Sequence, residues 1–365
     1  MTAPLAYSAQ DLAAFSAQVF RHCGLGGAHA ATVAKALVFA NLRGLDTHGV
    51  ARLPGYVERF ERALVDPRPP MTLESRFGWS AGVDGANGMG PVVGQYAMDE
   101  VLARAEAHGI GVATARRSNH FGAASFFALQ GVPRGCIAMV MSPASRSLAP
   151  FGSREPLFGT NPFAVACPAG RHAPWSMDMA TSIAARGHIR LAARHGRPIP
   201  EGWALDAEGR PTTDAERALR GVMLPFAGAK GSALAMMIDI LGGVLSGSAF
   251  GGDIRDMTRD FEAPQDVGHF FLAFKIEAFM PLAAFNRRME TEIARLKALP
   301  PAAGHGEVLY PGEPEARTEA RRAAEGIPIS AEVLESLKAV AGRAGVTLPA
   351  PFAGGPASAS SESLE

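Results

Sequence analysis

Through the middle of the chain, short apolar segments alternate with helical ones, and this alternation limits the possible folds more than any other feature of the sequence. Strands that alternate with helices indicate an α/β domain, in which helices cover a central sheet. Strands are predicted at residues 110–115, 136–141, 162–167, 175–179 and 269–276, and helices at residues 92–108, 123–130, 183–194 and 230–245. The sequence therefore predicts an α/β fold for its middle part.

Both ends of the chain are predicted to be helical. Ser8 is followed by acidic and apolar residues in a pattern typical of a helix start, and Gly24 ends that helix. Further helices are predicted at residues 28–42, 53–64, 281–299, 315–326 and 331–344. We therefore expect a helical segment at 1–70, an α/β domain at 71–280 and C-terminal helices at 281–345. Residues 349–365, which are rich in Ala, Gly, Pro and Ser, are expected to form a disordered tail.

Charge and cysteine content exclude several classes of protein. The 365 residues include 35 acidic and 35 basic side chains without a run of five like charges, so no nucleic-acid partner is expected. Three widely spaced cysteines and no spaced histidine cluster argue against a disulfide framework or a metal site. The apolar run at 233–248 contains Asp239 and several glycines, and it is too short to cross a membrane. With no signal peptide apparent, we expect a cytoplasmic protein.

The loop at 118–122, with the sequence SNHFG, is the most informative local feature. It follows a predicted strand and precedes a predicted helix, which is where α/β sheets place groups that contact ligands. His120 in this loop could donate a proton to a carbonyl oxygen, because the usual pKa of histidine suits work near neutral pH. The alternative is that His120 only caps the following helix.

A second candidate lies at residues 46–52, with the sequence DTHGVAR. His48 and Arg52 are four residues apart and share one face if this region is helical. Arginine is the usual bidentate partner of a carboxylate, so Arg52 could hold an acidic substrate. The alternative is a helix start capped by Asp46, with Arg52 as a solvated surface charge.

A third candidate is the turn at 225–232, in which Lys230 precedes an apolar helix. Such a turn presents backbone N–H groups and a cation to an anion. It lacks the GxxxxGK[ST] pattern of a Walker A loop, and by itself it is a weak signal.

Two motifs of other enzymes need to be weighed. Residues 78–82 match the GxSxG pattern of serine hydrolases around Ser80, but the glycine-rich sequence that follows cannot begin the helix which that motif requires. The GxGxxG pattern of Rossmann folds is missing, because Gly85, Gly88 and Gly90 are wrongly spaced. A dinucleotide would have to bind in another way.

An ordered set of motifs resembles the malate/L-lactate dehydrogenase-like family of NAD(P)-dependent oxidoreductases, a lineage apart from the Rossmann-type enzymes. The resemblance covers residues 12–329. Its motifs are RGLDTHG (43–49), SNHFG (118–122), GTNP (159–162), MDMATS (177–182), IPEGWA (199–204), KG (230–231), GHFF (268–271) and YPGE (310–313). Each motif is common, but the ordered set is highly specific.

The resemblance implies a role for each matching residue. His120 matches the proton-transfer residue, and His48 and Arg52 match positions that line the substrate pocket. The implied cofactor contacts are Ser142, Thr160, Asp178, Met179, Ala180 and Lys230. The family fold is a non-Rossmann cofactor-binding sheet domain flanked by a helical domain built from both chain ends. The implied cofactor is NAD or NADP, and the implied assembly is a homodimer.

The sequence departs from the family pattern at two positions. Ala227 stands where a second glycine is frequent, so the backbone there is expected to approach a cofactor less closely. His188 stands where lysine is frequent, which puts a contact to a cofactor phosphate in doubt.

The expected function is the interconversion of a 2-hydroxy acid and a 2-oxo acid. In this hypothesis Arg52 holds the carboxylate, His120 transfers the proton, His48 orients the substrate and Lys230 offsets negative charge. The alternative within the class is a reductase of cyclic 2-imino acids, of the piperideine-2-carboxylate or pyrroline-2-carboxylate type. Two alternatives from other classes are a hydrolase that uses Ser80 and a dinucleotide-binding sensor without activity.

Overall fold

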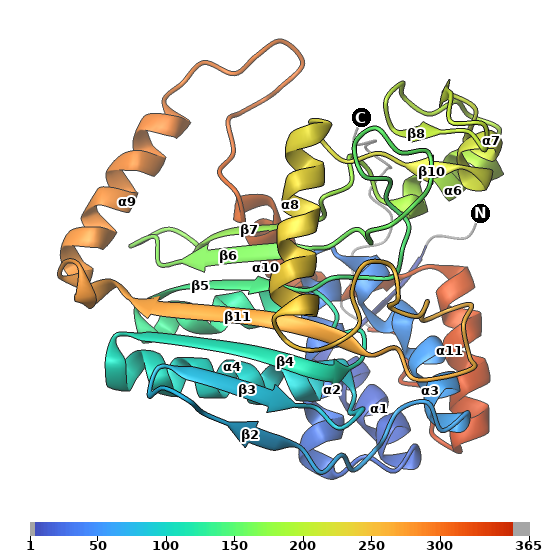
Figure 1. The fold of residues 1–365 in the computed structure, drawn as a ribbon, viewed down its shortest axis with the longest axis horizontal. Helices are drawn as coiled ribbons and strands as arrows, with labels where there is room; N and C mark the ends of the chain where they lie inside the picture. Colours follow the sequence, from blue (N-terminus) through green and yellow to red (C-terminus); the bar gives the residue numbers. More distant parts are fainter. Residues whose placement is uncertain (1–3, 353–365) are drawn as a thin grey trace. The chain divides into compact units, whose positions relative to one another are not determined.

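The computed structural model describes residues 4–352, which fold into two compact units. One unit combines the described residues up to Arg62 with those from Glu313 onward, and the other spans Ala63–Gly312. Figure 1 shows a large twisted sheet in the second unit and a bundle of helices in the first. The expected α/β class is confirmed. Most of the expected tail, residues 353–365, lies outside the described residues.

The sheet unit is organised around seven strands in the order β2-β3-β4-β11-β5-β6-β7. Only β3 and β4 pair in parallel, and the other neighbours are antiparallel. The strands are β2 (Thr72–Glu74), β3 (Ser80–Asp84), β4 (Ile110–Ser118), β5 (Cys136–Met141), β6 (Phe163–Cys167), β7 (Trp175–Met179) and β11 (Val267–Lys275). The strand of this sheet that comes last in the sequence, β11, therefore lies in its middle.

The strand register brings several loops to one edge of the sheet, which we call the loop edge. Val267 at the start of β11 pairs with Ser118 at the end of β4. Phe163 at the start of β6 pairs with Met141 at the end of β5 and with Met179 at the end of β7. The ends of β3, β4, β5 and β7 and the starts of β6 and β11 thus share this edge.

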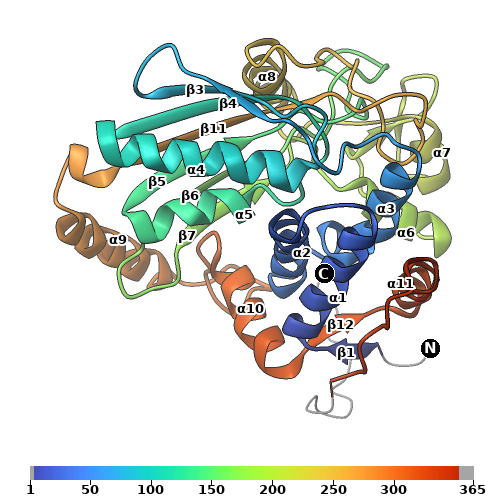
Figure 2. The same ribbon diagram turned by 90° about the horizontal axis from the view of Figure 1, so that it is seen from below.

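Helices cover both faces of the sheet. α4 (Gly90–His108) packs on β3, β4 and β11, and α5 (Ser125–Ala128) packs on β5, β6 and β7. α8 (Ala229–Asp239) continues into a π-helical turn, η4 (Ile240–Val244), which contacts β4 and β11 from the opposite face (Figure 2). The backbones of η4 and β11 approach so closely that a Cβ on Gly268 would lie 1.9 Å from the carbonyl oxygen of Gly242.

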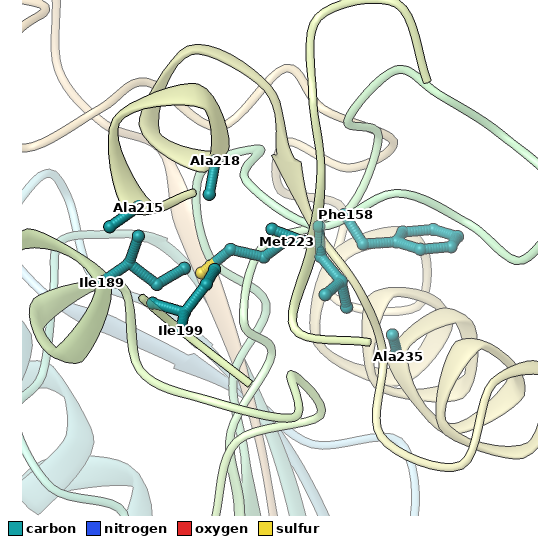
Figure 3. Packing of buried hydrophobic residues seen from close by; sticks show 9 residues of the cluster. Phe158, Ile189, Ile199, Ala215, Ala218, Met223 and Ala235 are labelled. Atoms are coloured by element: carbon teal, nitrogen blue, oxygen red, sulfur yellow. The ribbon is translucent and has the colours of Figure 1, made fainter. Parts of the chain in front are cut away.

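A small subdomain is inserted between β7 and α8. It contains α6 (Arg186–Arg194), α7 (Ala215–Arg220) and a three-stranded sheet of β8 (Ala204–Leu205), β9 (Pro211–Thr212) and β10 (Val222–Met223). Figure 3 shows its apolar core, in which Ile189, Ile199 and Met223 are 3% exposed or less. This core reaches Phe158 and Ala235, so the subdomain is joined to the loops before β6 and to α8.

α9 (Leu282–Lys297) belongs to the sheet unit. Its Ile293 packs with Ala169 and Tyr310, and the Glu290 carboxylate accepts the N–H of Arg171 at 3.0 Å. The sequence predicts that residues 281–345 belong with the C-terminal helices. In the structure α9 packs on the turn between β6 and β7 instead, so the sheet unit continues to Gly312. Only the helices after Gly312 group with the N-terminal ones.

The helical unit is built from α1 (Ala9–His22), α2 (Gly27–Leu42), α3 (Leu53–Glu61), α10 (Glu313–Glu325) and α11 (Ala331–Ala344). α10 contacts α2, and α11 contacts both α1 and α3. A two-stranded sheet of β1 (Leu5–Tyr7) and β12 (Ile327–Ile329) ties the two chain ends together. Ser8 caps α1 as predicted, since its Oγ accepts the N–H of Asp11.

Other predicted elements agree with the structure to different degrees. β5 and β7 have the predicted bounds, whereas β4 runs on to Ser118 and the predicted helix at 183–194 begins only at Arg186. The strand β3 was not predicted. It begins at Ser80, so this serine does not follow a strand as the hydrolase motif requires. Within residues 4–352, no helix combines the length and apolar character needed to cross a membrane.

Candidate functional site

Six of the predicted site residues lie at or beside the loop edge. His120 follows β4, Ser142 follows β5 and Thr160 precedes β6. Asp178 and Met179 end β7, and Ala180 is the next residue. β4 and β7 are four ladder steps apart, which is roughly 19 Å at about 4.8 Å per step. An extended ligand can therefore contact all of these loops.

Backbone strain is concentrated at the same edge. Non-glycine residues are in the left-handed region after β3, at the end of β4, before β6, before β11 and in the turn before α8. They are Ala86, Asn87, Arg117, Asn161, Asp266 and Ala227, with φ from 34° to 62°. Such residues cost about 1–3 kcal/mol each and cluster at functional sites. The loop edge therefore has the backbone strain that is typical of functional sites.

His120 is half-buried in the loop between β4 and α5. Its N–H donates to Oε1 of Gln265 at 3.1 Å. The neighbouring Asn119 is buried, and its amide donates to the carbonyl oxygen of Gly88 at 2.9 Å. The backbone on both sides of the imidazole is therefore held by side-chain hydrogen bonds.

Ser142 is linked to Ser118, two residues before His120, through a residue for which the sequence motifs implied no role. The imidazole of His269 on β11 is fully buried, and it lies 2.9 Å from Ser142 Oγ and 2.9 Å from Ser118 Oγ. A histidine within an apolar strand is a signal that could have drawn attention to it. Its place between β4 and β5 is visible only in the sheet order.

The end of β7 is tied to the loop of His120. The Asp178 carboxylate accepts the N–H of Ser125, the first residue of α5, at 2.9 Å. The Asp178 carboxylate therefore holds this helix start in place, in addition to the cofactor contact predicted for it.

Lys230 lies in the first turn of α8, and its side chain is exposed. The loop before it is held against the end of β7, because Phe226 donates its N–H to Thr181 at 3.0 Å and Pro225 pairs with Ser182. Ala227, expected to keep the backbone further from a cofactor than glycine, has a φ of 48°. It therefore adopts the backbone conformation that glycine would favour at this position.

A cavity of about 570 Å³ opens beside this turn. Its walls come from four loops and include Phe151, Arg154, Ile183, Leu224 and Gly228. Next to it, the hydroxyl of Ser182 is buried without a hydrogen-bond partner. Buried polar atoms usually have partners, so this one is available to a polar ligand. The apolar cavity thus has an unpaired hydroxyl next to its lining residue Ile183, and the exposed Lys230 follows two residues after its lining residue Gly228.

His48 and Arg52 belong to the helical unit, in two 3₁₀ turns, η1 (Asp46–His48) and η2 (Val50–Arg52), separated by an extended Gly49. The expected α-helical face is therefore absent from this loop. Arg52 still lies near His48, because its Nε donates to the carbonyl oxygen of Thr47 at 2.6 Å. Gly49 is required here, since a Cβ would lie 2.2 Å from the Asn41 amide oxygen.

The environment of His48 keeps its imidazole neutral. Burial, and to a smaller extent the nearby Arg52 cation, lower the pKa of His48 to about 4. Thr47 Oγ1 lies 3.1 Å from Nδ1. The alternative, in which Asp46 caps a helix, does not hold in the structure. Asp46 pairs with Arg322 of α10. At neutral pH His48 can therefore donate or accept one hydrogen bond, and Arg52 supplies the positive charge of this loop.

The geometry agrees with a comparison against protein families. A family model described as malate/L-lactate dehydrogenase matches residues 7–338. The chain belongs to this family. L-sulfolactate dehydrogenase from Methanothermobacter thermautotrophicus is 37% identical, with 85% of this chain and 88% of that protein covered. The Δ¹-pyrroline-2-carboxylate reductase of Pseudomonas fluorescens is 33% identical, with 93% of this chain and 99% of the relative covered.

Solved structures of malate/L-lactate dehydrogenase family members have the same fold. Malate dehydrogenase from Pyrococcus horikoshii superposes with a TM-score of 0.87 at 33% identity, over 95% of this chain and 97% of that one. These matches confirm the expected class of activity, an oxidoreductase of the dehydrogenase and reductase type acting on hydroxy acids or imino acids. Dehydrogenases of this family use nicotinamide cofactors.

Proposed function

We propose that this enzyme interconverts a 2-hydroxy acid and a 2-oxo acid with NAD or NADP. The observation that carries the proposal is the gathering of His120, Ser142, Thr160 and the end of β7 at one sheet edge. The sheet domain (71–280) holds the cofactor. In the helical segment (1–70), His48 and Arg52 are the proposed substrate contacts, and the helices near the C-terminus support this segment.

The substrate carboxylate binds Arg52, whose planar guanidinium suits two parallel hydrogen bonds to a carboxylate. His48 stays neutral near pH 7 and orients the 2-oxo group through one hydrogen bond. His120 donates its proton to the oxygen that becomes the hydroxyl, and it accepts that proton in the oxidative direction. The hydrogen bond from the His120 backbone to Gln265 holds the imidazole in place for this transfer.

The cofactor contacts we propose are Ser142, Thr160, Asp178, Met179, Ala180 and Lys230. When bound, a nicotinamide cofactor supplies or accepts the hydride at the 2-carbon. The exposed Lys230 offsets negative charge on the ligand, and the apolar cavity beside Ile183 excludes water from part of it.

A second candidate is the reduction of a cyclic 2-imino acid. The similarity to a pyrroline-2-carboxylate reductase over 93% of this chain favours it. Such substrates also present a carboxylate beside an electrophilic carbon, so Arg52 and His120 would keep their roles.

The test is a substrate panel with both cofactors. Pyruvate, oxaloacetate, sulfopyruvate, piperideine-2-carboxylate and pyrroline-2-carboxylate would be compared by loss of nicotinamide absorbance. We expect turnover of an open 2-oxo acid to exceed that of the cyclic imines. Preference for a cyclic imine would favour the second candidate, and no turnover of either type would contradict the proposal.

We also propose a homodimer in the cytoplasm. α8 and η4 expose a row of apolar side chains, Met236, Met237, Ile240, Val244 and Leu245, each at least 36% exposed. Contiguous exposed apolar surface of this kind marks an interface, and a row without charges can pack on its own copy without like-charge repulsion. The three cysteines are free, which suits a reducing compartment.

A further inference from the structure

Three buried side chains form a continuous polar connection across the loop edge. His269 Nδ1 lies 2.9 Å from Ser142 Oγ, and His269 Nε2 lies 2.9 Å from Ser118 Oγ. All three side chains are at most 4% exposed. Because Ser118 ends β4 and Ser142 follows β5, the imidazole bridges the two strands that flank β11.

The surroundings of His269 fix both its charge and its orientation. Phe121 stacks on the ring with 4.4 Å between centroids and 2° between planes. Burial lowers the pKa of His269 to about 3, so the ring is neutral at pH 7. A neutral imidazole offers one donor and one acceptor, and a serine hydroxyl can serve either. The connection is therefore complete in either tautomer.

Gln265, just before β11, makes a second connection to the same loop. Its Oε1 accepts the His120 N–H at 3.1 Å, and its Nε2 donates to the carbonyl oxygen of Arg255 at 3.1 Å. The side chain is 4% exposed. The amide thus joins the backbone of His120 to the loop between α8 and β11.

We propose that Gln265 and His269, at the start of β11, are positioning residues for the reaction. Gln265 fixes the backbone of His120, and His269 sets the relative positions of Ser142 and the loop that carries His120. The inference rests on the proposed function, in which His120 moves the proton and Ser142 contacts the cofactor.

The serines do not need the imidazole in order to remain paired. Ser118 Oγ also reaches the carbonyl oxygen of Asn119 at 3.4 Å, and Ser142 Oγ reaches that of Pro143 at 3.1 Å. Phenylalanine at position 269 could keep the stacking on Phe121 and would leave both hydroxyls with an acceptor. His269→Phe therefore removes the polar connection with limited harm to folding.

The first experiment measures hydrogen exchange in the protein without cofactor. We expect peptides spanning 118–127 to exchange faster in Gln265→Leu and His269→Phe than in the parent protein. Phe274→Leu is the matched control, because Phe274 lies on the same strand and packs on Phe279 rather than on residues 118–127, so its loss weakens packing without cutting a hydrogen bond. Selective faster exchange in the two variants, but not in the control, supports the positioning role. Unchanged exchange in both would overturn it.

The second experiment separates positioning from substrate binding. A displacement of about 1 Å can lower turnover by roughly 100-fold, so we expect kcat to fall by about 10- to 100-fold in both variants, with KM for the 2-oxo acid changed less than about threefold. His269→Phe should also weaken NADH binding, measured by fluorescence, by about tenfold through Ser142. Unchanged kcat and unchanged NADH affinity would contradict the proposal.

Gln265→Glu supplies a conservative test. The new carboxylate still accepts the His120 N–H but cannot donate to the carbonyl oxygen of Arg255, so kcat at the optimal pH should recover only part of what Gln265→Leu loses. The added negative charge raises the pKa of His120 and shifts the pH profile of kcat/KM upward. A profile identical to that of the parent would argue against the contact. If the parent turned over no substrate, the proposed function would fail, whereas exchange and NADH affinity would still decide the positioning role.

Discussion

Arg322 on α10 donates two hydrogen bonds to the carboxylate of Asp46, at 2.7 and 3.0 Å, across 276 residues of sequence. The guanidinium also donates to the carbonyl oxygen of Asn41 at 2.5 Å. Asn41 in turn accepts the N–H of Val50 and donates to Asp46. A helix near the C-terminus thus holds the N-terminal loop that carries His48 and Arg52.

Arg322→Lys should therefore loosen this loop, because lysine keeps the charge but loses the two-pronged geometry. We expect KM for the substrate to rise by about tenfold and the free energy of unfolding to fall by about 1 kcal/mol, since Asp46 is half-exposed. Steady-state kinetics and urea unfolding measure both. Arg317→Lys on the same helix, which weakens a pair with Glu313 four residues away, should change neither.

Replacement of His120 tests the proton transfer. His120→Ala should lower kcat by roughly 10²–10⁴-fold while NADH affinity and the circular dichroism spectrum stay as in the parent. His195→Ala, at an exposed position after α6, is the control and should keep full activity. Turnover at the parental rate in His120→Ala would rule out the proposed role.

Replacement of Arg52 tests the carboxylate contact. Loss of a charged hydrogen-bonded pair costs about 2 kcal/mol or more, so Arg52→Ala should raise KM for a 2-oxo acid by roughly 30-fold. Arg52→Lys should recover part of the loss. The corresponding neutral 2-oxo amide is the control substrate, and its KM should be the same in the parent and both variants. An equal loss for acid and amide would show that Arg52 acts on the fold instead.

The burial of His269 predicts a pH dependence of stability. The unfolded chain binds a proton at this residue below about pH 6.5, whereas the folded protein holds it neutral down to about pH 3. Its contribution is therefore fully present above pH 6.5 and is lost as the pH falls, by up to about 1.4 kcal/mol per pH unit. Urea unfolding at pH 7, 6 and 5 should show a shallower decline for His269→Phe than for the parent. His195→Phe, at an exposed site, should decline like the parent.

The exposed apolar row of α8 and η4 predicts the dimer interface. Ile240 and Val244 are 45% and 50% exposed, so glutamate at both positions should be tolerated by the fold. Like charges facing each other in a symmetric contact should convert the proposed dimer into monomers, as measured by light scattering after gel filtration. Leu191→Glu, at an exposed leucine of α6, is the control. A double variant that remains dimeric would place the interface elsewhere.

Local sequence patterns were sufficient to predict most secondary-structure elements and the loops of the candidate site. The bounds of β5, β7 and α11 follow from runs of apolar residues and helical spacing, because those patterns report which residues are buried. The loops around His120 and Lys230 were found from residue types next to these elements. Family membership followed from the order of the motifs.

The strand order, and with it the contacts of the site residues, depends on long-range pairing that local patterns do not reveal. Periodicity does not encode which strand pairs with which, so nothing local predicted that β11 lies between β4 and β5. That pairing puts His269 between Ser118 and Ser142 and brings Gln265 to His120. Likewise, the 3₁₀ turns around Gly49 depend on Asn41 and Arg322, which are distant in sequence or on another helix. Long-range contacts override local preference wherever a buried polar group needs a partner.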